Sequence, residues 1–319
     1  MATKKIHNLT ITPITIVLFI ITTLCGCDNG YKNPPALQRP ETAYSSSKLL
    51  SPTPHTALCE LLSVCGINHD GSAQDIINKT QQAWLRKPGT ERWEMDTLGK
   101  VSETYLPYFE KLGMVHEVAP SRGKYDYAFI LGATASSVRN RLAYLVSLWE
   151  KGIRFTTVVL LGSDRPLNST VETDSVLKNM PQQGLPTDKK WQAPATMPKT
   201  ESSMMRMLYE QVEMPDAMRK CPLIVVSSSQ TTAADGTIRR ATTADTIIDW
   251  LKMNMQPGTC LFISSQPYVG YQHAVVQTLL PQNFIPDTVG PHVKDPSKLD
   301  ISIFLDTLAR RIFQEYNQK

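Results

Sequence analysis

The sequence predicts an α/β protein in which a Rossmann-like parallel sheet carries helices on both faces and is preceded by a small helical segment. Two observations predict this fold. From residue 125 onward, short apolar runs alternate with amphipathic helical stretches, an order typical of a parallel sheet covered on both sides. From residue 56 to about residue 120, apolar residues recur at helical spacing instead. Right-handed crossovers between successive strands make the sheet Rossmann-like.

The first 26 residues are predicted to be a lipoprotein signal peptide. Lys4 and Lys5 precede an apolar stretch over residues 11–24, which is the order of an export signal. The stretch ends in Leu24-Cys25-Gly26-Cys27, which is typical of a lipobox whose last thiol accepts the lipid. A transmembrane anchor is the alternative, but the stretch is shorter than the roughly 20 residues that a spanning helix needs.

Lipidated Cys27 is expected to hold the protein on a membrane of the cell envelope, facing the periplasm, and Asp28 favours the inner membrane. Residues 27–55 then form a flexible tether, because their prolines and serines leave too few periodic apolar residues to bury. After this tether, residues 56–120 form the helical segment and residues 121–319 the Rossmann-like domain.

Composition limits the partners and the metal chemistry. The chain is 41% hydrophobic and 19% charged, and its net charge of +4 is dispersed rather than held in basic blocks, so no nucleic acid is expected. No zinc-type cysteine spacing occurs, and no metal site is predicted. Disulfides could join Cys59 to Cys65 and Cys221 to Cys260 in an exported protein, or all four thiols could be free.

The helical segment contains two stripes at helical spacing, the first formed by Ile76, Ile77, Thr80 and Trp84 and the second by Val101, Tyr105, Tyr108 and Leu112. Pro107 is expected to kink or split the second stripe. We interpret this segment as a structural cap on the main domain.

Four buried strands are predicted in that domain, at residues 126–131, 156–161, 223–227 and 261–264. A helix with Leu142 to Trp149 on one stripe follows the first strand and ends at Gly152. Further helices are expected near residues 200–212, from Thr242 onward with a capping box, and over residues 301–312.

Ligands of such sheets bind beyond the carboxyl ends of the strands. There, helix N-termini, hydroxyl groups and guanidinium groups suit a small anionic ligand. The predicted ligand-binding residues are Gly132, Thr134, Arg139, Arg141, Gly162, Ser163, Arg165, Ser227, Thr243, Asp245 and Tyr268. The structural alternatives are helix capping by Thr134, Thr243 and Asp245, an Asp164–Arg165 pair, and simple packing of His273.

Several common catalytic motifs are missing. The chain has no GxGxxG, P-loop lysine, GxSxG or HExxH sequence, so neither a standard nucleotide site nor a hydrolase triad is predicted.

The order of motifs YDYAFILG, RNRLAYLVSLWEKG, VVLLGSDRPL, a helix headed by Glu201, ATTADT and LFISSQPY resembles the YdcF-like family over about residues 124–285. The resemblance implies a Rossmann-like fold, a role in the cell envelope and S-adenosylmethionine as a candidate cofactor. It also implies pocket positions for Gly132, Arg141, Gly162, Glu201 and the Thr243/Asp245 segment, with Glu201 as the acid or base. This chain departs from the family at Ser227–Ser229, where an acidic residue is usual, and at Tyr268 to His273, where a His followed by an Arg is usual.

Two functions remain open on this basis. The protein is either an envelope lipoprotein that binds, and acts on, a nucleotide-like or lipid-linked sugar ligand, or a non-catalytic lipoprotein that uses the same pocket for binding in envelope maintenance. Its protein partner is not identified by the sequence.

Overall fold

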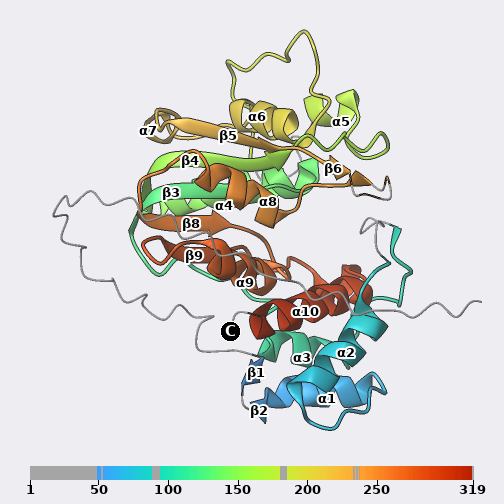
Figure 1. Ribbon diagram of the computed structural model, residues 1–319. Coiled ribbons are helices and arrows are strands. Elements are labelled where there is room, and N and C mark those ends of the chain that lie inside the picture. Colours follow the sequence, from blue (N-terminus) through green and yellow to red (C-terminus); the bar gives the residue numbers. More distant parts are fainter. Residues whose placement is uncertain are drawn as a thin grey trace, which may run out of the picture. The chain divides into compact units, whose positions relative to one another are not determined.

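The centre of the structure is a parallel sheet of five strands (Figure 1). The computed structural model describes residues 49–317 except 52, 88–93, 180–184, 233, 235 and 237. The strand order is β5-β4-β3-β8-β9, with β3 at Lys124–Leu131, β4 at Arg154–Ser163, β5 at Leu223–Ser228, β8 at Thr259–Ile263 and β9 at Ile285–Val289. All four predicted strands lie in this sheet with parallel pairing, which confirms the predicted fold class.

The α-helices are α1 (Thr56–Val64), α2 (Ala73–Trp84), α3 (Leu106–Lys111), α4 (Ala135–Glu150), α5 (Asp174–Lys178), α6 (Glu201–Gln211), α7 (Asp216–Arg219), α8 (Thr243–Leu251), α9 (Val269–Leu279) and α10 (Ile301–Tyr316). A 3₁₀ turn spans Pro296–Lys298. Two small antiparallel ladders join β1 (Leu50–Ser51) to β2 (Thr53–Pro54), and β6 (Thr231–Thr232) to β7 (Ile238–Arg239).

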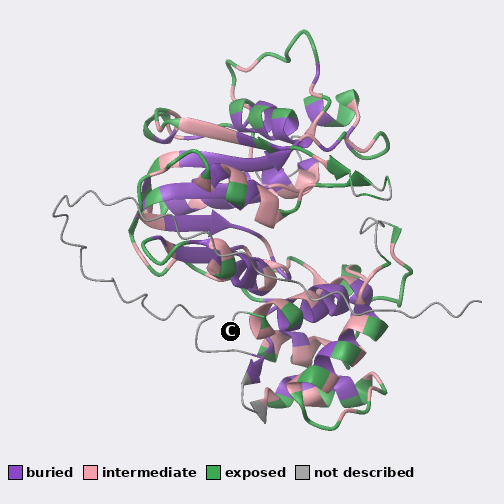
Figure 2. Cartoon of the chain, in the orientation of Figure 1, coloured by how far each residue is buried: buried purple, intermediate pink, exposed green. Residues whose placement is uncertain are grey.

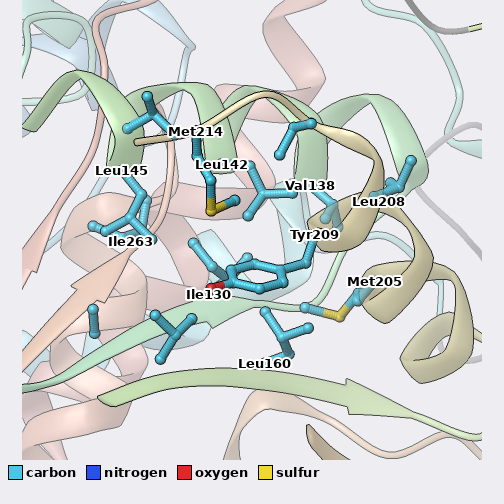
Figure 3. Close-up of a cluster of buried hydrophobic side chains, with 14 of the residues drawn as sticks. Ile130, Val138, Leu142, Leu145, Leu160, Met205, Leu208, Tyr209, Met214 and Ile263 are labelled. Carbon is cyan, nitrogen blue, oxygen red and sulfur yellow. The ribbon is translucent and has the colours of Figure 1, made fainter. Parts of the chain in front are cut away.

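Successive side chains of each strand point to opposite faces of the sheet. Both faces therefore present side chains for packing, and helices cover both. On one face, Ile130 and Leu160 meet α4 and α6, and Figure 3 shows Leu142 and Leu208 among the residues packed there. On the other face, Phe129 stacks on Phe262 with ring centroids 4.2 Å apart, under the helices α8 and α9. Figure 2 shows most of β3, β4 and β8 buried between these layers.

A second core joins the two ends of the described chain. Helices α1, α2, α3 and α10 share it, and Phe109 of α3 stacks on Phe304 of α10 with centroids 4.5 Å apart. The stripe predicted from Ile76 to Trp84 forms the buried face of α2. Pro107 does not kink a longer helix, because α3 begins beside it and the proline lies in the first turn, where its missing N–H costs nothing.

The folded part begins before the end of the predicted tether. Leu49 and Leu50 are buried, and the Leu49 amide donates to Glu315 at 2.9 Å. The signal peptide, Cys27, Asp28 and the tether up to residue 48 lie outside the described residues. No helix in the described part of the chain is both long and apolar enough to span a bilayer.

Cys59, Cys65, Cys221 and Cys260 are all free in the described chain. Cys260 lies on β8, whereas Cys221 lies two residues before the start of β5. The strands β3 and β4 separate β5 from β8, so the pairing of Cys221 with Cys260 has no basis in the sheet order.

Candidate functional site

Two glycines let the first turn of α6 reach the carboxyl ends of β3 and β4. A Cβ atom on Gly162 would lie 2.8 Å from Cα of Ser202, and one on Gly132 would lie 3.0 Å from Oε1 of Glu201. The first distance is shorter than real Cβ atoms show, and the second would force the Glu201 side chain to shift, so glycine at both positions permits the approach of the helix. The predicted site residues Gly132, Gly162 and Glu201 are therefore together at one edge of the sheet.

The carboxylate of Glu201 is the centre of this edge. Its Oε2 accepts from the amide of Ser163 at 3.1 Å and from the Ser163 hydroxyl at 2.7 Å. Its Oε1 lies 3.6 Å from the guanidinium of Arg165. Burial raises the pKa of Glu201 above its usual range, against the opposing effects of Arg165 and the two hydrogen bonds from Ser163. We call Glu201, Ser163, Arg165 and Glu172 the edge cluster.

Glu172 belongs to this cluster although the sequence did not single it out. It accepts from both terminal nitrogens of Arg165, at 3.1 and 3.3 Å, and its side chain is buried. Its Oε1 also accepts from the amide of Ala135, the first residue of α4, at 3.0 Å. The N-terminus of α4, predicted to attract an anionic ligand, thus holds a carboxylate of the protein itself.

Arg139 does not reach the edge cluster. Its guanidinium donates to Oε1 of Gln211 and to the carbonyl of Leu185, both at 2.7 Å, and the side chain is fully buried. The guanidinium of Arg139 thus joins α4 to the end of α6 rather than to the edge cluster, and ligand binding by Arg139 stays a prediction. Arg141 donates to the carbonyls of Leu131 and Gly132, at 2.7 and 2.9 Å, and so lies at the end of β3.

Two more predicted residues lie near the first turns of helices. Thr134 is the N-cap of α4, and its hydroxyl contacts that of Ser137 at 3.3 Å. Ser227 reaches α6, since its hydroxyl lies 2.8 Å from that of Ser202, the residue after Glu201. Ser227 is therefore connected to the edge cluster through Ser202.

The remaining predicted residues begin α8 and α9. Asp245 accepts from the amide of Thr242 at 2.7 Å and pairs with both terminal nitrogens of Arg239, which holds its pKa well below its usual range. Asp245 thus forms the predicted capping box. Thr243 is the first residue of α8, and half-buried Tyr268 is the N-cap of α9.

The first turn after β3 does not suit the adenosyl cofactor that the family resemblance implies. Dinucleotide-type sites use glycine there to bring the backbone against the ligand. Here the space beside Gly132 is filled by Glu201 and by the carbonyl of Leu161. Among the described residues, no group of His, Cys, Asp and Glu is arranged to hold a metal ion.

Comparison of the chain with protein-family models, with curated proteins and with solved structures finds no match. The resemblance to the YdcF-like family implies a fold, a role and a cofactor. The structure bears on the fold alone, and the parallel α/β sheet agrees with it.

Proposed function

We propose that this protein is a lipid-anchored component of the cell envelope that binds a small polar molecule at the carboxyl edge of its sheet, with Glu201 as the central binding group. One observation carries the proposal. A carboxylate with little exposure to solvent is held at the strand ends by Ser163 and Arg165, at the place where parallel α/β sheets bind their ligands. A desolvated carboxyl group whose pKa is raised is typical of functional sites.

The charge balance of the edge favours a neutral, hydroxyl-bearing ligand such as a sugar over the anionic ligand expected from the sequence. Arg165 lies between two carboxylates, those of Glu172 and Glu201. Arg139 is engaged with Gln211 and Leu185. The hydroxyls of Ser202 and Ser227, together with the Glu201 carboxyl group, offer donors and acceptors that match sugar hydroxyls.

We infer binding without catalysis as the main role. Strand β5 ends in Ser227 and Ser228 rather than in an acidic residue, so this strand provides no carboxylate partner for Glu201. Acid–base chemistry by Glu201 is the second candidate, because its raised pKa favours a protonated carboxyl group that can donate a proton.

The ligand proposal is tested by thermal-shift measurements on the full chain in detergent micelles. The probes are N-acetylglucosamine and its 1-phosphate, which differ by the phosphate group and the negative charge that it carries. A probe at 100 times its dissociation constant should add about 2.7 kcal/mol of stability. Glu201→Gln should abolish the shift, whereas Glu210→Gln on the exposed face of the same helix should keep it. Stabilisation by the 1-phosphate alone would favour the anionic ligand instead.

The anchor is tested separately. Cys27→Ser should leave the precursor unprocessed or release the protein from membranes, as judged by fractionation and by labelling with a fatty acid. Unchanged acylation of the Cys27→Ser protein would show that another residue carries the lipid.

A further inference from the structure

A groove of about 480 Å³ lies outside the edge cluster and is lined by the chain that follows α3. The chain from Lys111 to Ala119 forms one part of the lining, which is completed by Leu49, His55 and Arg311. The amide of Gln266 donates to the carbonyls of Gly113 and His116, at 2.9 and 2.8 Å. These two bonds hold the chain that lines the groove, so the groove is formed before any ligand binds.

The residues from Glu117 to Ala119 extend the sheet as a short edge strand. Val118 exchanges two hydrogen bonds with Gly290, which directly follows β9, at 3.0 and 3.1 Å. In an antiparallel pair of this kind, the N–H and C=O groups of the flanking residues point away from the partner. Among the described residues, the backbone groups of Glu117 and Ala119 have no hydrogen-bond partner. The groove therefore contains an open strand edge.

The charged side chains of the groove are already paired. Arg311 forms an ion pair with Glu315 at 2.6 Å. The ammonium of Lys111 lies 3.7 Å from Glu60, and the ring of His116 lies 3.7 Å from a carboxylate of α3. The groove thus has no excess of positive charge for an anion to match, and this balance favours an uncharged ligand.

Apolar side chains line the groove beside the open edge. They are those of Leu49, Leu112, Val118 and Ala119. An extended peptide matches both features, because its backbone can bond to the edge while every second side chain meets the apolar lining. We propose that this groove binds an extended, uncharged segment of a partner protein by strand addition to residues 117–119. The site is independent of the edge cluster and goes beyond the function proposed above.

The test uses equilibrium dialysis of the peptide acetyl-Ala-Leu-Ala-Leu-amide against the full chain in detergent micelles. Two isomers of this peptide carry N-methyl groups, either on both Ala residues or on both Leu residues. Alternate amides of a strand point to opposite sides, so only one isomer loses the amides that face the edge. That isomer should bind about fivefold more weakly for each hydrogen bond lost, and the other should bind as tightly as the parent peptide. Identical micelles are used throughout, so partition into detergent is compared directly.

A substitution at Ala119 locates the site. Ala119→Pro removes one backbone donor from the open edge and should weaken binding of the parent peptide by about fivefold. Ala119→Ser keeps that donor and is the matched control, with unchanged affinity. Far-UV circular dichroism of both variants checks that the fold is retained, and the methylated isomers test the same bonds on the wild-type chain.

Four results would overturn the proposal. The first two are no detectable binding of the parent peptide and equal binding of the parent and both isomers. The third is loss of peptide binding in Glu201→Gln, which would move the site to the edge cluster. The fourth is a wild-type dimer that Ala119→Pro dissociates, which would make a second copy of this chain the occupant. Failure of the sugar probes at Glu201 would leave the groove proposal intact.

Discussion

Titration of the single residue Glu201 makes the free energy of unfolding of the protein depend on pH. Burial raises the pKa of its carboxyl group in the folded state. As the pH rises above the pKa of the unfolded chain, about 4.3, the unfolded state loses this proton while the folded state keeps it. The stability that Glu201 contributes is therefore fully present below that pH and is lost as the pH rises through the folded pKa.

The Glu201→Gln variant removes this titration. Its free energy of unfolding should rise relative to that of the wild-type protein between pH 4 and pH 7, by about 1.4 kcal/mol for each unit by which the pKa is raised. Urea denaturation at several pH values measures the difference. Glu210→Gln is the control on the same helix and should stay within about 0.5 kcal/mol at every pH. A relative stability that falls with pH would mean that Arg165 and Ser163 outweigh burial.

Arg139 should matter for stability and not for ligand binding. Arg139→Met keeps the apolar stem but leaves Gln211 and the carbonyl of Leu185 without their donors, which should cost about 2–3 kcal/mol. Arg206→Met is the control, because Arg206 is exposed and pairs with Glu210 one turn away, and it should cost less than about 0.5 kcal/mol. Thermal unfolding measures both. A stable Arg139→Met protein with weakened anion binding would restore the clamp predicted from the sequence.

At the level of single residues, the sequence identified some members of the candidate site and missed others, for physical reasons. Glu201 was found through its family-like position at the head of a helix after the second strand. Glu172 lies in the polar stretch before α5, where no periodicity or motif distinguishes one carboxylate from another. Arg139 and Arg141 lie two residues apart on α4, and spacing alone does not decide which of them faces the strand ends.

Among the elements, the strands that contain continuous apolar runs were predictable, including the edge strand β5, and the other edge strand, β9, was not. Each of β3, β4, β5 and β8 contains a run of at least four apolar residues, as expected for strands of a parallel sheet covered by helices. In β9, Pro286 and Asp287 interrupt the run. This strand forms one end of the sheet, where one side needs no ladder partner and proline is tolerated.

The close contact between α6 and β4 predicts that a substitution in the strand displaces the first turn of the helix. Gly162→Ala places a methyl group 2.8 Å from Cα of Ser202, so the first turn of α6 must move away from the strand and carry Glu201 with it. The expected cost is about 1–3 kcal/mol, measured by urea denaturation, together with loss of any ligand bound at the edge.

Gly123→Ala is the matched control for that prediction. No atom lies within 4 Å of the added methyl group there, and its effect should stay within about 0.5 kcal/mol. Equal effects of the two substitutions would show that α6 is not held against β4 at this distance.

For the molecule as a whole, the last helix joins the first ones. The buried face of α10 includes Ile301, Phe304, Leu308 and Ile312, and it packs in the second core with α1, α2 and α3. The sequence predicted the helix and its apolar stripe but assigned the helix to the Rossmann-like domain. An apolar stripe shows which face of a helix is buried, but it does not show which element that face packs against. The helical segment at residues 56–120 is therefore completed by residues more than 180 positions further along the chain.

A double-mutant cycle between α3 and α10 tests this long-range connection. Phe109 and Phe304 are both fully buried and stacked, so Phe109→Leu and Phe304→Leu should each cost about 1–2 kcal/mol. The two effects should differ from additivity by about 0.5–1.5 kcal/mol, the range for an aromatic pair. Phe284 lies in the core under α8 and α9, so Phe109→Leu combined with Phe284→Leu should be additive within about 0.5 kcal/mol. Additivity in the first pair would mean that α10 does not pack against α3 in solution.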